Sequence, residues 1–344
     1  MSTYSFLDDY SEGCHPAILD ALASTNLAQQ TAYGDDEYSI RARALIRAQL
    51  RSADLPVYFV ASGTLANLII IASALRPHEA VIAAVSGHIV MRETGAIEAT
   101  GHKIISIPSA DGKLTPADIE TAVAGNAQAP HMARPRLVYI SNATEFGTVY
   151  SHAELTALRA VCDVHGLLLL IDGARLGAAL SAPASDVSLS DIAQVADAFW
   201  IGGTKAGALI GEAIVLPNAG IAEDFAYGVK QRGALLAKGR LLGLQFQTLF
   251  EGGLYFELAA HGNAMAQKLS DGIARAGHSL AAQTQSNQVF PILPNALIER
   301  LREQFAFYTW SEMDDARAVI RLVTSWATDE AQVDALIERI NSAS

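Results

Sequence analysis

Cysteine and positive charge are both scarce in this chain of 344 residues. Its two cysteines, Cys14 and Cys162, lie far apart in dissimilar contexts, which excludes a disulfide framework and a cysteine-based zinc site. Lysine and arginine number 24 against 36 aspartates and glutamates, so the net charge is −12. Nucleic acids and anionic membranes bind clustered positive charge, so we expect neither as a partner. The cysteine usage fits a reducing, cytoplasmic location.

Long apolar runs and targeting signals are also missing. The apolar segment 68–75 is too short to cross a bilayer, and the first residues lack the basic-then-apolar order of a secretory signal. We find no internal repeat and no low-complexity tract. The chain is 51% hydrophobic, which is enough for a large core and suits one large domain with a smaller one.

The middle of the chain alternates between short apolar runs and helical patterns. Strands are predicted at residues 57–60, 80–85, 103–107, 136–141, 167–171, 198–201 and 212–216, and helices at residues 65–75, 88–100, 118–124 and 151–165. Residues 167–171 are all aliphatic, which is typical of a central parallel strand. The loop before residue 212 is too short for a helical crossover, so the strand after it is expected to be antiparallel. This alternation predicts an α/β domain with helices on both faces of a mostly parallel sheet.

The two ends of the chain differ from this middle part. An irregular arm and helices at residues 16–22 and 40–50 come first, and residue type alone favours a helix cap over a binding role for Asp8 and Asp9. A long helix is predicted at residues 254–277. A smaller α/β unit follows, with strands at 288–293, 305–310 and 318–324 and helices at 296–304 and 329–342. We predict an arm and large domain over residues 1–247 and a small domain over residues 248–344.

One lysine stands out because of its surroundings. The apolar run ending at Ile201 leads into Gly202-Gly203-Thr204-Lys205, and no second charge follows until Glu212. Burial disfavours the ammonium form, lowers the pKa and makes a free amine available for Schiff-base chemistry. The alternative is an ordinary lysine in a surface loop, and this stretch alone does not decide between the two.

Other strand ends also carry residues suited to binding, and ligands of open α/β sheets bind at the carboxyl ends of strands. Ser62, Gly63 and Thr64 open a predicted helix, where free amides form an anion site, although simple capping by Ser62 explains them equally well. Asp172 ends the aliphatic strand and needs a partner there. That partner is either Arg175, in a structural pair, or the protonated nitrogen of a pyridine cofactor.

Three more side chains belong to this set of candidates. His88 follows a strand and either stacks on a planar cofactor and moves protons, or serves as a core or capping histidine. The Thr204 hydroxyl is placed to reach a phosphate. Arg321 lies within the apolar strand 319–323, so it needs an anion, either a structural carboxylate or the carboxylate of an amino-acid substrate.

The order of these motifs resembles the threonine aldolase family, closest to the low-specificity L-threonine aldolases and phenylserine aldolases. The matching segments are Tyr33-Gly34-Asp35 and residues 62–67, 143–147, 172–175, 203–205 and 319–328, so the resemblance covers nearly the whole chain. It implies the aspartate-aminotransferase-like fold (type I) of pyridoxal-phosphate enzymes. It also implies pyridoxal 5'-phosphate as cofactor and a homodimer or homotetramer with the active site at the subunit interface.

The resemblance assigns a role to each matching position. Catalytic roles fall to Lys205, as the Schiff-base lysine, and to His88 and Glu145. The implied cofactor ligands are Ser62, Gly63, Thr64 and Thr204 at the phosphate, His88 on the ring, Asp172 at the pyridine nitrogen, Arg175 at the phenolic oxygen, and Lys238 from a segment that reaches the subunit interface. The implied substrate ligands are Asp9, Tyr33, Arg175 and Arg321, with Arg321 on the carboxylate. No metal site is expected.

Two departures from the family pattern concern charged residues. Many members carry a histidine near the position of Glu145, and a Ser-Asp pair where this chain has Asp8-Asp9. A carboxylate at Asp8 would repel the carboxylate of a substrate. Both departures bear on the proton transfer and substrate binding that the resemblance implies.

The implied reaction is retro-aldol cleavage of a β-hydroxy-α-amino acid to glycine and an aldehyde. His88, Glu145 or a held water molecule could each accept the proton of the β-hydroxyl group. Transamination, β-elimination and decarboxylation remain alternatives, because a fold does not select its chemistry. A cofactor-binding protein without turnover is a further alternative. A nucleotide-binding protein is disfavoured, because no Gly-x-Gly-x-x-Gly motif or Walker lysine stands in the right place.

Overall fold

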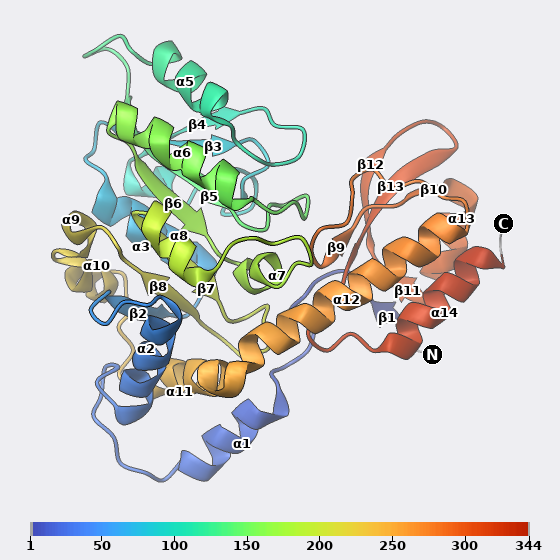
Figure 1. The fold of residues 1–344 in the computed structure, drawn as a ribbon, viewed down its shortest axis with the longest axis horizontal. Helices are drawn as coiled ribbons and strands as arrows, with labels where there is room; N and C mark the ends of the chain where they lie inside the picture. The colour runs from blue at the N-terminus through green and yellow to red at the C-terminus, as the bar shows by residue number, and fades with distance from the viewer. Residues whose placement is uncertain (1–2, 343–344) are drawn as a thin grey trace.

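A seven-stranded sheet dominates the computed structural model, which describes residues 3–342 (Figure 1). The strands run in the order β2-β8-β7-β6-β5-β3-β4, and all are parallel except β8, which is antiparallel to both of its neighbours. Their bounds are β2 Val57–Val60, β3 Glu79–Ala84, β4 Lys103–Ile107, β5 Arg134–Ser141, β6 Leu168–Asp172, β7 Ala198–Gly202 and β8 Glu212–Val215. The predicted α/β sheet and its antiparallel strand are confirmed.

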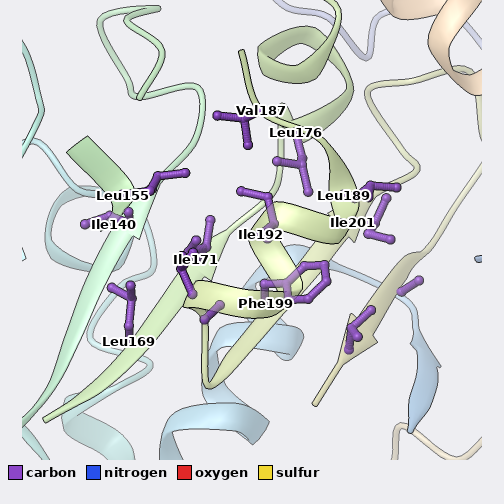
Figure 2. Packing of buried hydrophobic residues seen from close by; sticks show 14 of the residues in the cluster. Ile140, Leu155, Leu169, Ile171, Leu176, Val187, Leu189, Ile192, Phe199 and Ile201 are labelled. Atoms are coloured by element: carbon purple, nitrogen blue, oxygen red, sulfur yellow. The ribbon is translucent and has the colours of Figure 1, made fainter. Parts of the chain in front are cut away.

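Helices cover both faces of this sheet because successive side chains of the inner strands point to opposite faces. On one face, Leu169 and Ile171 of β6 pack in a cluster with α5 Pro116–Gly125, α6 His152–His165 and α8 Leu189–Val195, as Figure 2 shows in part. On the other face, Leu168 and Leu170 pack with α3 Gly63–Ala74, α9 Ala219–Ala222 and α10 Phe225–Gln231. The predicted capping box at Ser151 and the left-handed Gly166 that ends α6 are both present.

A smaller unit follows the long helix α12 Leu254–Arg275 (Figure 1). Its sheet pairs β13 Arg317–Val323 with β9 Gln288–Val289, β10 Ile292–Pro294 and β12 Tyr308–Glu312, all antiparallel. Helices α13 Asn295–Arg302 and α14 Glu330–Asn341 share a core with α12 and this sheet. The predicted boundary near residue 247 falls within α11 Arg240–Phe250 and stays a prediction.

The N-terminal segment connects the two parts of the molecule. Strand β1 Tyr4–Ser5 pairs in parallel with β11 Phe305–Ala306, and Phe6 lies in the core of the smaller unit. Helices α1 Pro16–Thr25 and α2 Glu37–Gln49 then pack with α11 beneath the large sheet (Figure 1). A Cβ on Gly243 of α11 would lie 2.1 Å from the Ser39 hydroxyl, so this crossing of α2 and α11 requires glycine.

Four predictions of local structure are wrong. Residues 88–100 form only the short helices α4 His88–Met91 and η1 Glu98–Thr100, because Thr94 and Gly95 take left-handed conformations between them. Pro291, which has no amide hydrogen, separates β9 from β10. The predicted strand 305–310 divides because β11 pairs with β1 whereas β12 pairs with β13. No helix begins near Asp8 and Asp9, since α1 starts at Pro16 and its N-cap is His15.

No helix within residues 3–342 is long and apolar enough to cross a membrane.

Candidate active site

A cavity of about 410 Å³ opens at one edge of the large sheet. It collects residues from the carboxyl ends of β2, β3, β5, β6 and β7 and from the start of β8, whose reversed direction brings Glu212 to the same edge. The predicted site residues that line it are Ser62, Gly63, Thr64, His88, Glu145, Asp172, Arg175, Thr204 and Lys205. These positions are separated by up to 143 residues in sequence, from Ser62 to Lys205, and the parallel topology brings them together.

Lys205 lines this cavity and is half-buried there. Burial, followed by the positive charge of Arg175, lowers the pKa of its ammonium group, although Asp9, Asp172 and Glu212 act in the opposite direction. Its Nζ lies 5.7 Å from the centre of the Tyr10 ring. A lowered pKa leaves more of the amine unprotonated at neutral pH, which favours the Schiff-base alternative over the ordinary surface lysine.

Asp172 is buried at the end of β6 and held by directed hydrogen bonds. Its Oδ2 accepts hydrogen bonds from the Tyr139 hydroxyl at 2.5 Å and from Asn67 Nδ2 at 3.0 Å, while Oδ1 accepts from the amide of Ala174 at 2.9 Å. Trp200 Nε1 donates to the Asn67 carbonyl oxygen at 3.0 Å and fixes the orientation of that amide. The carboxylate is therefore positioned without a cationic partner of its own.

Arg175 pairs with Asp9 rather than with Asp172, which excludes the alternative of a structural pair between Asp172 and Arg175. Arg175 Nε and NH2 donate to the two Asp9 oxygens at 2.7 and 3.0 Å, and Asn287 Nδ2 donates to Asp9 Oδ2 at 2.9 Å. Burial alone would raise the pKa of Asp9, but the charges of Arg175 and Lys205 hold it below its ordinary value. Asp9 thus anchors the N-terminal segment against the cavity, and its role as a substrate ligand stays a prediction.

His88, the first residue of α4, and Glu145, in the loop after β5, both line the cavity. The His88 amide donates to Glu145 Oε1 at 3.0 Å, and the Ser141 hydroxyl donates to the same oxygen at 2.8 Å. Burial raises the pKa of Glu145. The His88 ring contacts the buried carboxylate of Glu93, with Nδ1 and Oε1 2.8 Å apart. Two carboxylates therefore hold this histidine at its backbone and at its ring.

The start of α3 and the Thr204 loop form another wall of the cavity. Ser62 caps α3 by accepting the amide of Leu65, whereas the amides of Gly63 and Thr64 have no hydrogen-bond partner within residues 3–342. Free amides at a helix N-terminus attract anions. The Thr204 hydroxyl donates to Glu212 Oε1 at 2.9 Å, and burial raises the pKa of Glu212 to about 7.

Arg321, on strand β13, lies beside Asp8 of the N-terminal segment. Its NH2 is 3.7 Å from Asp8 Oδ1, and its guanidinium lies over the rings of Tyr308 and Trp310. Arg321 Nε is buried without a partner in the described chain. The Asp8 carboxylate also accepts hydrogen bonds from the hydroxyls of Tyr10 and Tyr308, at 3.1 and 3.4 Å. This arginine therefore has an unfilled donor beside one loosely held carboxylate.

Tyr33 and Lys238 do not line this cavity. The Tyr33 amide donates to the carbonyl of Ala237, the residue before Lys238, at 3.1 Å. Both side chains are exposed, and the Tyr33 ring lies under Lys230 Nζ at 4.9 Å. The two predicted ligands are thus neighbours on the surface.

The sequence did not identify four residues that complete the cavity: Tyr10, Asn67, Glu93 and Glu212. Asn67 gave a signal, since it is a polar residue in the apolar helix 65–75, but its partners Glu93 and Asp172 are 26 and 105 positions away. Glu212 starts β8, the antiparallel strand of the large sheet, and only the predicted reversal of that strand could have placed it at this edge. Within residues 3–342, no group of three or more His, Cys, Asp or Glu side chains is arranged to hold a metal ion.

Comparison with known proteins gives the class of this chain. Residues 6–295 match the family described as beta-eliminating lyase, and the chain belongs to that family. It is 37% identical to a low specificity L-threonine aldolase of a Pseudomonas species, over 97% of this chain and 96% of the relative. Its structure superimposes on a threonine aldolase of Leishmania major with a TM-score of 0.97 and 48% identity, covering 99% of both chains.

A more distant likeness defines the fold. A Thermus thermophilus aspartate aminotransferase matches with a TM-score of 0.74 at 15% identity, covering 99% of this chain and 92% of that one. The expected aspartate-aminotransferase-like fold and the resemblance to threonine aldolases are thereby confirmed.

Proposed function

We propose that this protein is a pyridoxal-phosphate-dependent aldolase that cleaves β-hydroxy-α-amino acids to glycine and an aldehyde. The substrates would be of the L-threonine, L-allo-threonine or L-phenylserine type. The observation that carries the proposal is the placement of Lys205, Asp172 and the free amides of Gly63 and Thr64 around one cavity. The names of the similar proteins support the reaction type.

The residues of the cavity fit pyridoxal phosphate in their chemistry. Lys205 offers a desolvated amine for the aldehyde carbon, and the amides of Gly63 and Thr64 offer unfilled donors for a phosphate. Asp172 offers a buried, fixed carboxylate for the ring nitrogen. The volume of about 410 Å³ lies in the usual range of ligand cavities. When bound, the cofactor would accept the electron pair released as the Cα–Cβ bond breaks.

The chain's own residues then divide the work. Asp172 would keep the ring nitrogen protonated, which makes the ring a stronger electron acceptor. Arg321, whose Nε is unfilled, would hold the substrate carboxylate and so align the bond that breaks. Arg175, held by Asp9, would bind the phenolic oxygen of the cofactor. His88, Glu145 or a held water molecule would accept the β-hydroxyl proton.

An absorption spectrum tests the cofactor assignment. We expect a visible band after pyridoxal phosphate is added to the wild-type protein, and no such band for Lys205→Ala, because the amine that binds the aldehyde is gone. Lys103→Ala, on the edge strand β4, is the matched control and should keep the band. A wild-type protein that gains no visible band, or an unchanged band in Lys205→Ala, would refute the assignment of Lys205.

Products separate the aldolase from other reactions of the same fold. Release of an aldehyde without a keto-acid co-substrate supports cleavage, whereas transamination needs a keto acid. β-Elimination gives ammonia and a keto acid, and decarboxylation gives carbon dioxide. Each alternative leaves a different small molecule to measure.

We also propose that the active site is completed by a second subunit in a homodimer or homotetramer. Support comes from the adjacent surface positions of Tyr33 and Lys238, which lie outside the cavity of their own chain. We further place the protein in the cytoplasm, because Cys14 and Cys162 are both buried and unpaired. Light scattering and cell fractionation test these two statements.

A further inference from the structure

The ring of His88 lies against a carboxylate that the reaction described above does not use. Glu93 Oε1 is 2.8 Å from His88 Nδ1, and the Glu93 side chain is fully buried whereas that of His88 is 41% exposed. Both residues line the cavity. A buried carboxylate beside one ring nitrogen of a histidine is the arrangement that fixes a tautomer and orients the ring.

The Asn67 amide fixes the direction of these hydrogen bonds. Its carbonyl oxygen accepts the indole hydrogen of Trp200, so its nitrogen must be the donor on the other side. That nitrogen donates to Glu93 Oε1 at 2.9 Å and to Asp172 Oδ2 at 3.0 Å. Glu93 Oε1 therefore accepts from Asn67, and as an ionised carboxylate it can only accept from His88 as well. Glu93 Oε2, also buried, has no partner within the described residues.

The backbone takes an unusual path to bring Glu93 under His88. Helix α4 ends at Met91, and Thr94 and Gly95 follow with φ of 54° and 72°. A left-handed threonine is disfavoured, and such residues concentrate at functional sites where the surroundings enforce them. A regular helix through residues 88–100 would point residue 93 away from residue 88, since positions five apart lie on different faces. The break that refuted the predicted helix is therefore the feature that forms the pair.

We propose that Glu93 is the positioning residue that fixes the tautomer of His88, and this inference rests on the proposed function. The carboxylate accepts the Nδ1 hydrogen, which leaves Nε2 as the ring nitrogen that can accept the β-hydroxyl proton. Nε2 has no hydrogen-bond partner among residues 3–342. The proton moves from the substrate oxygen to Nε2, and the resulting imidazolium is stabilised by the negative charge of Glu93. Among the candidate bases, this arrangement selects His88.

Other charged groups also surround His88, and the test keeps them unchanged. Glu145 receives its backbone amide, and Asp172 is linked to Glu93 through Asn67. Lys205 and Arg175 stand in the same cavity as positive charges. Substitution of Glu93 alone leaves all four of these groups in place.

The experiment compares Glu93→Gln with the wild type as holoenzymes cleaving β-phenylserine across a pH series. Glutamine keeps the size and one acceptor of the side chain but removes its charge. We expect kcat to fall about 10- to 100-fold with KM within about twofold. The shape of the kcat profile should change as well, because the imidazolium that forms during the reaction loses its counter-charge. Glu98 is an exposed glutamate in the next turn, and Glu98→Gln should leave kcat, KM and the pH profile unchanged.

A double variant distinguishes positioning from a structural role. In a His88→Phe background, which keeps a ring but removes Nδ1, the added Glu93→Gln change should alter kcat less than about twofold. A full effect in that background would mean that Glu93 acts through Asn67 and Asp172, which would overturn the proposal. An unchanged kcat and pH profile in Glu93→Gln alone would overturn it equally.

The bound cofactor is measured in every variant through its visible band, so that activities refer to loaded enzyme. If the wild type itself gave neither band nor aldehyde, the proposed function would fail. If the wild type gave both and Glu93→Gln matched it across the pH series, only the inference about Glu93 would fail.

Discussion

Glu212 is a buried cavity residue whose ionisation is opposed by its surroundings. Burial raises its pKa from 4.5 to about 7, and its two oxygens accept hydrogen bonds from Gly203 and Thr204. In the unfolded chain the carboxyl group ionises near 4.5, so the stability that the protonated form contributes is complete below that pH. It is lost as the pH rises through about 7.

Replacing Glu212 with glutamine should therefore flatten the stability profile of the cofactor-free protein. Between pH 4.5 and 8, the free energy of unfolding of the wild type should fall relative to Glu212→Gln by about 3 kcal/mol. Urea unfolding at a series of pH values measures this difference. Glu223→Gln, an exposed control, should run parallel to the wild type. Parallel curves for Glu212→Gln as well would contradict the raised pKa.

Among single residues, the sequence identified those that differ from their neighbours along the chain and missed those whose role depends on distant partners. Lys205 was recognisable because no charge lies within six positions after it, and Asp172 because it ends an aliphatic strand. Glu93 was one of two glutamates on the predicted helix 88–100, with nothing to distinguish it from Glu98. Its contact with His88 depends on the end of α4 at Met91, and its partner Asn67 is 26 positions away, so the local sequence pattern indicates neither contact.

The N-terminal segment is the element that ties the cavity to the smaller unit. Strand β1 pairs with β11, and Asp9 pairs with Arg175 behind the cavity. The side chains of Asp9 and Arg175 are 1% and 12% exposed. Removing one charge from such a pair leaves the other buried without compensation.

Asp9→Asn should consequently lower the free energy of unfolding by about 3–5 kcal/mol. Urea unfolding monitored by tryptophan fluorescence checks this, since Trp326 lines the small cavity that Asp9 also lines. Asp20→Asn, an exposed aspartate on α1, should change stability by less than about 0.5 kcal/mol. A loss of under about 1 kcal/mol in Asp9→Asn would show that the ion pair does not anchor the segment.

Elements were predictable where one physical signal dominated. The capping box at Ser151 and the glycine at 166 defined both ends of α6, and the aliphatic run gave β6. The arm was not predictable, because the aspartates at positions 8 and 9 carry the residue types of a helix cap. Their actual partners, Arg175 and Arg321, lie more than 160 positions away.

The whole molecule places Tyr33 and Lys238 together on the surface, outside the cavity of their own chain. If they complete the site of a partner subunit, two inactive variants should restore activity when mixed. Dissociated and reassembled Lys205→Ala and Lys238→Ala proteins should regain about a quarter of wild-type activity, because half of the dimers would be hybrids with one intact site of two.

The matched control mixes Lys205→Ala with Asp172→Ala. Both residues line the cavity of one chain, so no hybrid contains an intact site and no activity should return. Equal failure of both mixtures, with assembly confirmed by light scattering, would place the complete site within a single chain. The α/β class of the large sheet was predictable from alternation, whereas this relation between subunits rests on surface positions that only the folded chain reveals.

Product stoichiometry tests the central claim most directly. β-Phenylserine incubated with the protein and pyridoxal phosphate should give benzaldehyde and glycine in equal amounts, with no keto acid added. The Lys205→Ala protein should give neither above the rate with free cofactor. Ammonia and a keto acid in place of glycine, or aldehyde formation that does not depend on Lys205, would contradict the account.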